Sequence, residues 1–294
     1  MLDPQLLTAP ALADHDLDLD GAQRVTYLLE QSFRYDYPMP AQRLRHRLVV
    51  LPPARHGSQH LRAHRLDVHG ASVRRVTRRD RHGNTVVRLS TDRVEASVQF
   101  RVGALLERVR RDGPVRLPAT ALSDAPFLRA TTLTAADERL RDLAAAVTRR
   151  AGTPVELATD ICHTVHGALT YQYGVTSIRT TAADALAGGR GVCQDSAHIM
   201  LALCHLLAIP ARYVSGHLLG QGGTHAWVEV ITAHADHAIA TAFDPCNGRA
   251  ATARYLTVAT GRDYSDIAPT SGTYHGPPGA RLTTTRRLAV LHTA

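Results

Sequence analysis

The chain has 294 residues, enough for two domains with buried cores, and its apolar content of 44% excludes gross disorder. Its formal charge of +8 comes from arginine, because the sequence contains no lysine. No apolar run reaches the length of a membrane helix, and residues 1–20 lack the basic segment and apolar stretch of a secretory signal. We therefore predict a cytoplasmic protein with no membrane partner.

The arginine excess and the cysteine pattern bear on partners and cofactors. The arginines are spread along the sequence without zinc-finger, RRM or helix–turn–helix spacing, so we predict no nucleic-acid partner. The four cysteines form no CxxC pair, and no HExxH motif is present. These patterns predict neither a metal site nor a cofactor. Without lysine, the protein cannot be its own amine acceptor through a lysine side chain.

The N-terminal half predicts a β-sandwich over residues 22–112, behind an extension at residues 1–21. Short segments rich in valine and leucine alternate with glycine and proline turn signals, a pattern typical of antiparallel strands. Expected strands lie at residues 44–51, 63–68, 85–90 and 94–102, and residues 80–84 predict a hairpin turn. Residues 113–130, which contain prolines, are predicted to be a linker.

Residues 131–260 predict a core in which helices pack on an antiparallel sheet. Apolar residues at helical spacing follow Asp137, and a second helix is expected from Pro154 to about Leu169. After a glycine-rich break, residues 193–207 are apolar nearly all round, which indicates a buried helix. Three strands are expected at residues 211–219, 225–231 and 239–244. Residues 261–294 form a C-terminal segment expected to pack on the core or the β-domain, and the fold class is α+β.

Cys193 is the candidate nucleophile because it begins the buried helix directly after the glycine-rich break. A thiol at a helix N-terminus lies near the positive end of the helix dipole and near free backbone N–H groups. Both stabilise the thiolate, which is the reactive form. The alternative is that Cys193 is one more small buried residue, like Cys204 on the same helix.

His225 and Asp244 complete a candidate catalytic set. His225 begins one predicted strand, and its ordinary pKa suits a general base near neutrality. Asp244 ends the next strand, where its carboxylate is expected to accept the Nδ1 proton of His225 and hold the useful tautomer. Either residue alone is weak evidence, but the order helix-start Cys, strand His, strand Asp is specific.

Four motifs together resemble those of the transglutaminase-like family. They are GVCQD at 191–195, IPARYVSG at 209–216, HAWVE at 225–229 and FDP at 243–245. Residues 35–37, 80–84, 261–266 and 272–274 are similar to parts of the bacterial branch, which carries an N-terminal β-domain. The resemblance implies a papain-like core with a Cys–His–Asp triad at Cys193, His225 and Asp244. This chain departs from the family pattern at His217, where tyrosine is frequent, and at Cys246, where threonine is frequent.

Further residues near these motifs have both a functional and a structural interpretation. Gln194 is a candidate oxyanion donor, although the backbone N–H of Cys193 is a more general one. Tyr173 is a candidate wall of the substrate pocket or a half-buried packing residue. Asp195 either tunes the thiolate or stabilises the helix start.

The same two interpretations apply on the strands. Trp227 either shields the His–Asp pair from water or belongs to the core, and the core is favoured. His217 either contacts substrate or is an exposed residue at a strand end. Cys246 either forms an oxidative contact with Cys193 or is a small-residue replacement, which we prefer.

These residues predict acyl transfer on amide bonds through a thioester on Cys193. Hydrolysis by a protease or amidase is favoured over cross-linking, and formation of a new amide with a small amine stays open. The expected partner is a peptide or protein substrate, or a small amine acceptor. Alternatives of other classes are a non-catalytic peptide-binding scaffold and a metal-dependent hydrolase. The sequence leaves the oligomeric state open.

Overall fold

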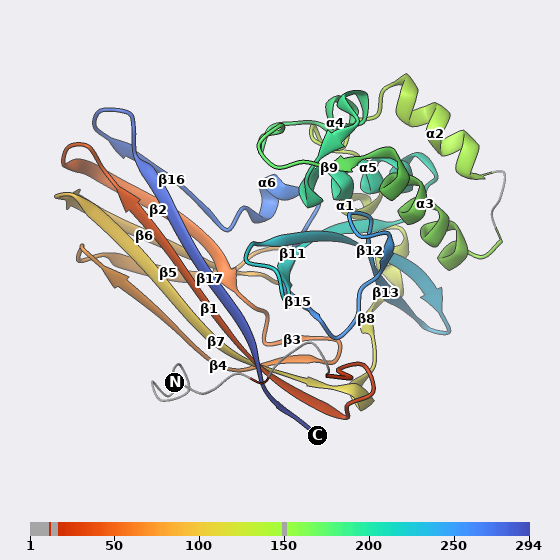
Figure 1. Ribbon diagram of the computed structural model, residues 1–294, viewed down its shortest axis with the longest axis horizontal. Coiled ribbons are helices and arrows are strands. Elements are labelled where there is room, and N and C mark those ends of the chain that lie inside the picture. The colour runs from red at the N-terminus through yellow and green to blue at the C-terminus, as the bar shows by residue number, and fades with distance from the viewer. Residues whose placement is uncertain (1–11, 13–16, 149–151) are drawn as a thin grey trace.

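The computed structural model describes residue 12 and residues 17–148 and 152–294. Most of the predicted extension, residues 1–11 and 13–16, lies outside the described residues. The chain forms a β-lobe and a core lobe that stand side by side, with helix α6 (Tyr264–Ile267) between them (Figure 1). This arrangement confirms the predicted α+β fold class, with a β-sandwich ahead of a core of helices on a sheet.

The β-lobe consists of two antiparallel sheets that face each other. Within the described residues, one sheet has the strand order β17-β1-β7-β4-β3 and the other the order β16-β2-β6-β5. The strands are β1 (Arg24–Asp36), β2 (Ala41–Leu51), β3 (Arg55–His56), β4 (Gln59–His69), β5 (Arg74–Arg79), β6 (Thr85–Val94), β7 (Ser97–Val109), β16 (Thr270–His275) and β17 (Arg281–Thr293). Alternate residues such as Leu44, Leu48, Val87 and Leu89 point inward and bury the apolar face shared by both sheets.

The C-terminal segment completes both sheets of the β-lobe. Strand β17 pairs with β1 along its whole length, from Val25 opposite Thr293 to Asp36 opposite Arg281. Strand β16 pairs with β2 on the second sheet. The chain therefore leaves the β-lobe after β7, builds the core, and returns to the β-lobe.

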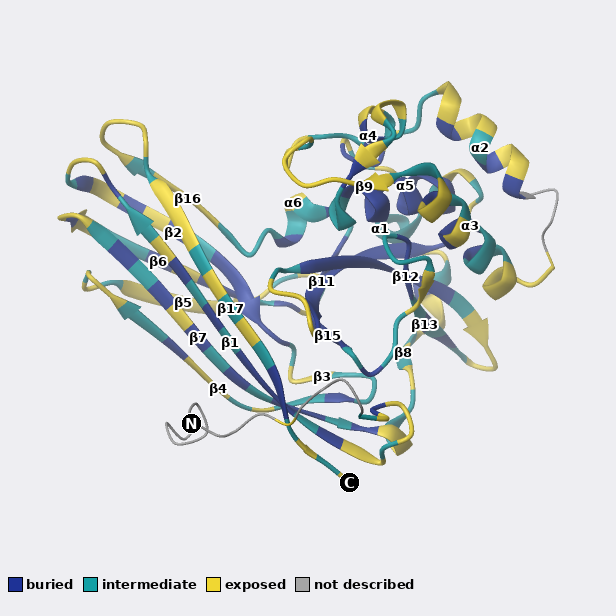
Figure 2. Ribbon diagram, in the orientation of Figure 1, coloured by how far each residue is buried: buried dark blue, intermediate teal, exposed yellow. Residues whose placement is uncertain are grey.

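The core lobe packs helices on one face of an antiparallel sheet of order β14-β13-β12-β11-β15. The helices are α1 (Ala125–Leu128), α2 (Glu138–Thr148), α3 (Pro154–Ala168), α4 (Ala182–Gly188) and α5 (Cys193–Leu206), and the strands are β11 (Ala211–Leu218), β12 (His225–His234), β13 (His237–Asp244), β14 (Arg249–Ala250) and β15 (Tyr255–Gly261). Short strands β9 (Thr170–Tyr171) and β10 (Arg190–Gly191) pair in parallel, and β10 is followed directly by α5. Strand β11 is buried along its whole length (dark blue in Figure 2). Residues 113–130, the predicted linker, supply β8 (Val115–Pro118), which pairs with β13.

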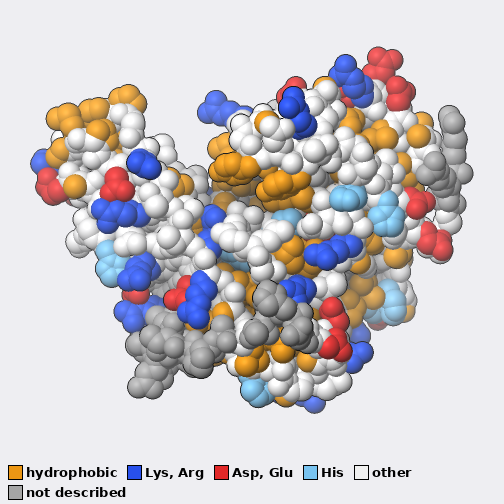
Figure 3. Space-filling model, in the orientation of Figure 1, with side chains coloured by type: hydrophobic (Ala, Val, Ile, Leu, Met, Phe, Trp, Pro, Cys, Tyr) orange, Lys and Arg blue, Asp and Glu red, His pale blue; other side chains and the backbone are white. Residues whose placement is uncertain are grey.

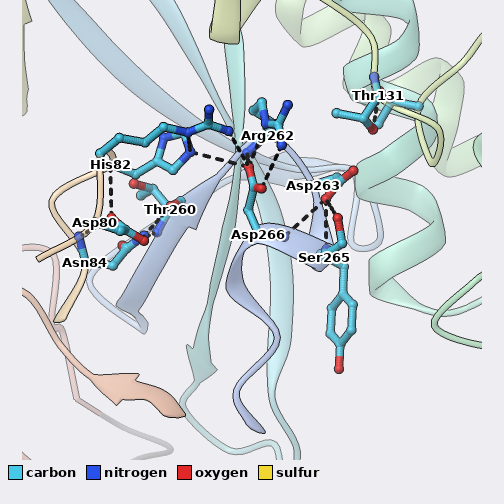
Figure 4. Close-up of polar contacts among 12 residues, drawn as sticks. Asp80, His82, Asn84, Thr131, Thr260, Arg262, Asp263, Ser265 and Asp266 are labelled. Carbon is cyan, nitrogen blue, oxygen red and sulfur yellow. Dashed lines mark hydrogen bonds and ion pairs between the residues drawn. The ribbon is translucent and has the colours of Figure 1, made fainter. Parts of the chain in front are cut away.

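The β5–β6 hairpin turn fixes the two lobes to each other. Asn84 in this turn donates from its amide to the carbonyl of Thr260 at 2.7 Å and accepts from the Thr260 N–H at 2.9 Å (Figure 4). Asp80 holds the Asn84 amide from the other side at 2.9 Å. Nearby, Asp266 accepts a hydrogen bond from Arg262 at 2.8 Å and lies 3.3 Å from His82. The polar network makes the hairpin a fixed part of the interface.

No helix in the described part of the chain has both the length and the hydropathy needed to cross a membrane.

Candidate active site

Cys193 is the first residue of α5, and the structure explains why the helix begins there. Asp195, three residues after the N-cap residue Val192, accepts the Val192 N–H at 2.8 Å and the Thr176 hydroxyl at 2.6 Å. A β-carbon on Gly191 would lie 2.7 Å from that carboxylate, so only glycine fits before the turn. Asp195 thus stabilises the helix start, as one of its two interpretations held. The half-buried Cys193 thiol is left beside the N–H groups of the first turn.

Asp244 is fully buried at the end of β13 and accepts hydrogen bonds on both oxygens. Oδ2 lies 2.7 Å from His225 Nε2, and it accepts from the amide of Asn247 at 2.6 Å and the hydroxyl of Tyr255 at 2.7 Å. Oδ1 accepts the backbone N–H groups of Cys246 and Asn247. Although burial, the largest influence, raises the pKa of Asp244, the bond to His225 and the other donors hold that pKa below its ordinary value. The carboxylate is therefore ionised and fixed in place.

The orientation of His225 differs from the expectation. The sequence argument assigned Nδ1 to Asp244, but Nε2 makes that contact. The expected assignment was wrong because the side chain of Asp244 approaches the ring from its far end, which strand order alone does not reveal. With Nε2 bound to Asp244, Nδ1 is the ring nitrogen left to exchange a proton with Cys193. Burial lowers the pKa of His225, but hydrogen bonds to Asp244 and Cys193 and their negative charges raise it to about 9.

The other candidate site residues Gln194, Tyr173 and Trp227 differ in how far they are buried. Gln194 is half-buried, and its amide lies 3.4 Å from the Ser177 carbonyl. Tyr173 is 87% exposed, so it is not the half-buried residue of the packing interpretation. Trp227 is buried and packs edge-on against Tyr255, with ring centroids 5.5 Å apart, and its centroid lies 6.2 Å from that of His225. Trp227 is a core residue that also covers the His–Asp pair.

His217 is not an exposed residue at a strand end, which was one of its two interpretations from the sequence. It is 2% exposed, and burial lowers its pKa to about 4. The expected exposure fails because β11 is buried along its whole length, including the end that carries His217. His217 therefore does not lie on a surface open to substrate.

Cys246 lies close to the charges of Cys193 and Asp244, and burial raises the pKa of its thiol to about 12. All four cysteines are unpaired. Among the described residues, no group of three or more potential ligands is arranged to hold a metal ion.

Sequence reasoning missed Tyr255 and Asn247, which hold Asp244. Asn247 directly follows the FDPC segment, so its position after the strand-end aspartate was an available signal. Tyr255 comes from the neighbouring strand β15, and only the sheet order brings its hydroxyl to Asp244. Its hydroxyl also accepts a hydrogen bond from Arg249 at 3.0 Å, which orients it.

Helix α5 against an antiparallel sheet, with a cysteine at the helix start and a buried His–Asp pair on adjacent strands, defines a papain-like cysteine-enzyme fold. The family model of the transglutaminase-like superfamily matches residues 141–242, and that of the bacterial transglutaminase-like N-terminal region matches residues 27–107. The chain belongs to the transglutaminase-like superfamily, and its β-lobe carries the bacterial N-terminal region.

Relatives of known sequence and structure agree with this placement. An uncharacterised protein of Mycobacterium leprae is 39% identical over 118 residues, which are 37% of this chain and 40% of that protein. One from Mycobacterium tuberculosis is 33% identical over 130 residues, 40% of this chain and 41% of that protein. The matches thus span less than half of these relatives. The crystal structure of a proposed cysteine protease from Cytophaga hutchinsonii has a TM-score of 0.74 at 22% identity and covers 92% of each chain, which shows the shared fold.

Proposed function

We propose that the protein is a cysteine hydrolase that cleaves amide bonds of peptides through a thioester on Cys193. The observation that carries this proposal is the position of His225, which contacts Asp244 through Nε2 and lies near enough to Cys193 for their charges to interact. His225 takes the thiol proton, and the sulfur attacks the carbonyl carbon of the substrate. When the tetrahedral adduct collapses, the C–N bond breaks and His225 gives the proton to the leaving amine.

Water completes the cycle. It attacks the thioester carbonyl while His225 accepts one of its protons, and the C–S bond then breaks to release the acid and restore the thiolate–imidazolium pair. The oxyanion formed in both steps is assigned to the backbone N–H of Cys193, at the helix start. Asp244 keeps its charge throughout and stabilises the imidazolium.

Hydrolysis requires access of water to the thioester on Cys193. Tyr171, which lies near enough to Cys193 for their charges to interact, is 62% exposed, and Tyr173 is more exposed still. The side of the thiol near Tyr171 is therefore in contact with solvent. In the space-filling view the core lobe also turns a group of hydrophobic side chains toward the β-lobe (Figure 3), a surface suited to substrate side chains.

The decisive experiment incubates a peptide library with the protein, with and without an added primary amine, and weighs the products. Acid products that persist in the presence of the amine support the hydrolase. Amine adducts would instead make the protein a transferase that uses the same thioester. The matched control is Cys204→Ser, which removes a buried thiol from the same helix, whereas Cys193→Ala is expected to abolish turnover. If no peptide is cleaved or transferred and Cys193 is not selectively alkylated, the protein is a binding scaffold.

The cytoplasmic location belongs to the same proposal. Four unpaired cysteines, including a nucleophile that must stay reduced, suit a compartment that keeps thiols reduced.

A further inference from the structure

The outer face of the four-stranded sheet gathers arginines that lie far apart in the sequence. On adjacent strands, residues that pair in register point to the same side of the sheet. Arg47 on β2 pairs with Arg88 on β6, and Arg45 pairs with Ser90 of β6, which in turn pairs with Arg74 of β5. We call the full set the arginine face: Arg43, Arg45, Arg47, Arg74, Arg78 and Arg88.

The arginine face lines a hollow of about 1220 Å³ that contains one acidic residue, Asp92. The opposite side of the same strands is the buried core of the sandwich, so these guanidinium groups cannot turn inward. Strand spacing makes the arginine face about 14 Å along the strands and, over the three strands β2, β6 and β5, about 10 Å across them. An extended peptide segment of about four residues spans that length.

The charges of the arginine face lack acidic partners. Within the residues that the structure describes, none of the six forms an ion pair, and Arg47 donates only to the neutral carbonyl of Asp266 at 2.7 Å. Some exposed arginines elsewhere on the β-lobe are paired with an acid two residues away, as in Arg65 with Asp67 and Arg93 with Glu95. Arg47 directly opposite Arg88 is a like-charge cross-strand pair, which destabilises a sheet. An anionic ligand would relieve this repulsion. The high arginine content of the chain does not by itself explain why these arginines lack acidic partners.

Acidic polypeptide fits this surface better than nucleic acid. No phenylalanine, tyrosine or tryptophan lines the hollow, and its one histidine, His46, is buried, so bases would find no exposed ring on which to stack. Guanidinium groups bind carboxylates through two parallel hydrogen bonds. The hydroxyls of Ser90, Ser271 and Thr273 line the same hollow and can bond peptide carbonyl groups.

The arginine face is also connected to the active-site helix. Arg47 bonds α6 at Asp266, and the N–H of Tyr264, at the start of α6, donates to His198 of α5 at 3.2 Å. Helix α5 begins at Cys193. These two hydrogen bonds therefore link the sheet that carries the arginine face to the helix that carries the thiol.

We propose that the arginine face is a docking site for a segment rich in aspartate and glutamate in a polypeptide substrate. The role as a substrate dock rests on the proposed peptide hydrolysis, but binding to the arginine face does not. Docking increases the local concentration of the substrate near Cys193 and gives preference to acidic proteins, while the arginine face itself takes no part in bond cleavage.

Binding is tested with the full chain carrying Cys193→Ala, so that no turnover occurs. A fluorescein-labelled decapeptide of glutamate is titrated, and its anisotropy is compared with that of a glutamine decapeptide. We expect the glutamate peptide to bind at least tenfold more tightly, with an affinity that falls as salt is raised. Arg45→Gln combined with Arg88→Gln should weaken binding at least tenfold, whereas the matched control Arg65→Gln, which removes a paired arginine, should not. Thermal melting checks that both variants stay folded.

Equal binding of the two peptides, or unchanged binding by the double variant, would overturn the docking site. So would displacement of the glutamate peptide by a single-stranded oligonucleotide whose negative charges are at a lower total concentration than those of the peptide, because this result would indicate a nucleic-acid surface. Turnover then tests the link to catalysis in the chain with Cys193 intact. In the double variant, kcat/KM for a short neutral peptide should be unchanged, while KM for an acidic substrate rises. Failure of the proposed hydrolysis would remove turnover of both substrates but leave the anisotropy result intact.

Discussion

His56 of the β-lobe and Glu229 of the core are joined by a 2.6 Å contact inside the boundary between the lobes. The other carboxylate oxygen of Glu229 accepts two hydrogen bonds from Arg212, at 2.7 and 2.6 Å. Burial, the largest influence, raises the pKa of Glu229, but Arg212 and His56 overcome it and lower that pKa to about 2. The lobes are therefore held together in part by a buried charge.

Glu229→Gln should lower the free energy of unfolding by about 3–5 kcal/mol, because it leaves the Arg212 guanidinium buried without a carboxylate. Urea denaturation followed by circular dichroism measures this change. The matched control is Arg212→Met with Glu229→Met, which removes both charges and should recover most of the loss. If the free energy of unfolding of Glu229→Gln lies within 1 kcal/mol of that of the parent protein, Glu229 does not have the assigned role.

The same carboxylate predicts a loss of stability in acid. Since the pKa of Glu229 is lower in the folded chain than its ordinary value of 4.5, its contribution is fully present above that value and is lost as pH falls toward about 2. The melting temperature should drop through this window, and the drop should be smaller in Glu229→Gln. Parallel curves for the two proteins would show that other carboxylates dominate.

His225 should stay protonated up to about pH 9 in the resting enzyme, since Asp244 and Cys193 favour the imidazolium. The alkaline limb of kcat/KM is expected near that pH, because the leaving amine then loses its proton donor. Asp244→Asn should move the limb to lower pH and reduce the rate, with NMR of labelled histidine reporting the titration directly. The control is Asp236→Asn, which changes an exposed acid on the turn before β13. If the alkaline limb does not move in Asp244→Asn, the limb does not report the titration of His225.

Cys193 should react selectively with sub-stoichiometric iodoacetamide below pH 7. Cys204 is fully buried, and burial raises the pKa of its thiol to about 12, so it serves as the internal reference. Peptide mapping by mass spectrometry measures the label at each cysteine. His225→Ala should remove the selectivity, and slow, equal labelling of all four cysteines would rule out a thiolate–imidazolium pair.

Gly216 is predicted to tolerate no side chain. A β-carbon there would lie 2.1 Å from the Leu256 carbonyl oxygen and 2.5 Å from the Trp227 ring, and Gly216 pairs in register with His225. Gly216→Ala should cost about 1–3 kcal/mol of stability or more and disturb the histidine. Gly222→Ala, where no atom lies within 4 Å of the added carbon, is the control. Equal stability of the two variants would contradict the packing argument.

The sequence predicted the elements whose apolar pattern is local and strong. Helix α5 starts at Cys193 as predicted, and strands β11 to β13 start within two residues of the predicted positions. Their local apolar patterns are strong, because β11 and most of β12 are buried and β13 buries alternate residues in its first half. The strands of the candidate site could therefore be placed in order along the chain. What the order could not supply is which ring nitrogen of His225 meets Asp244.

Other features depend on pairing between distant segments. Strand β5, with the sequence RRVTRR, has every residue exposed, so no apolar alternation indicated it. The arginine face escaped notice for the same reason: its members are dispersed in sequence and are brought together only by the register of β2, β5 and β6. The hydroxyl of Tyr255 likewise reaches Asp244 through sheet order.

The pairing of β17 with β1 has a consequence for how the molecule assembles during translation. The ribosome makes β1 more than 240 residues before the end of β17, so the first sheet waits with an open edge while the entire core is produced. Such distant pairing carries a large loop-closure cost and slows folding. The apolar residues Leu288 and Val290 of β17 pack with Leu256 and Val258 of the core, so a core that has already formed stabilises the docking of the last strand. Pairing of β17 with β1 thus completes the β-lobe after the core lobe has been made.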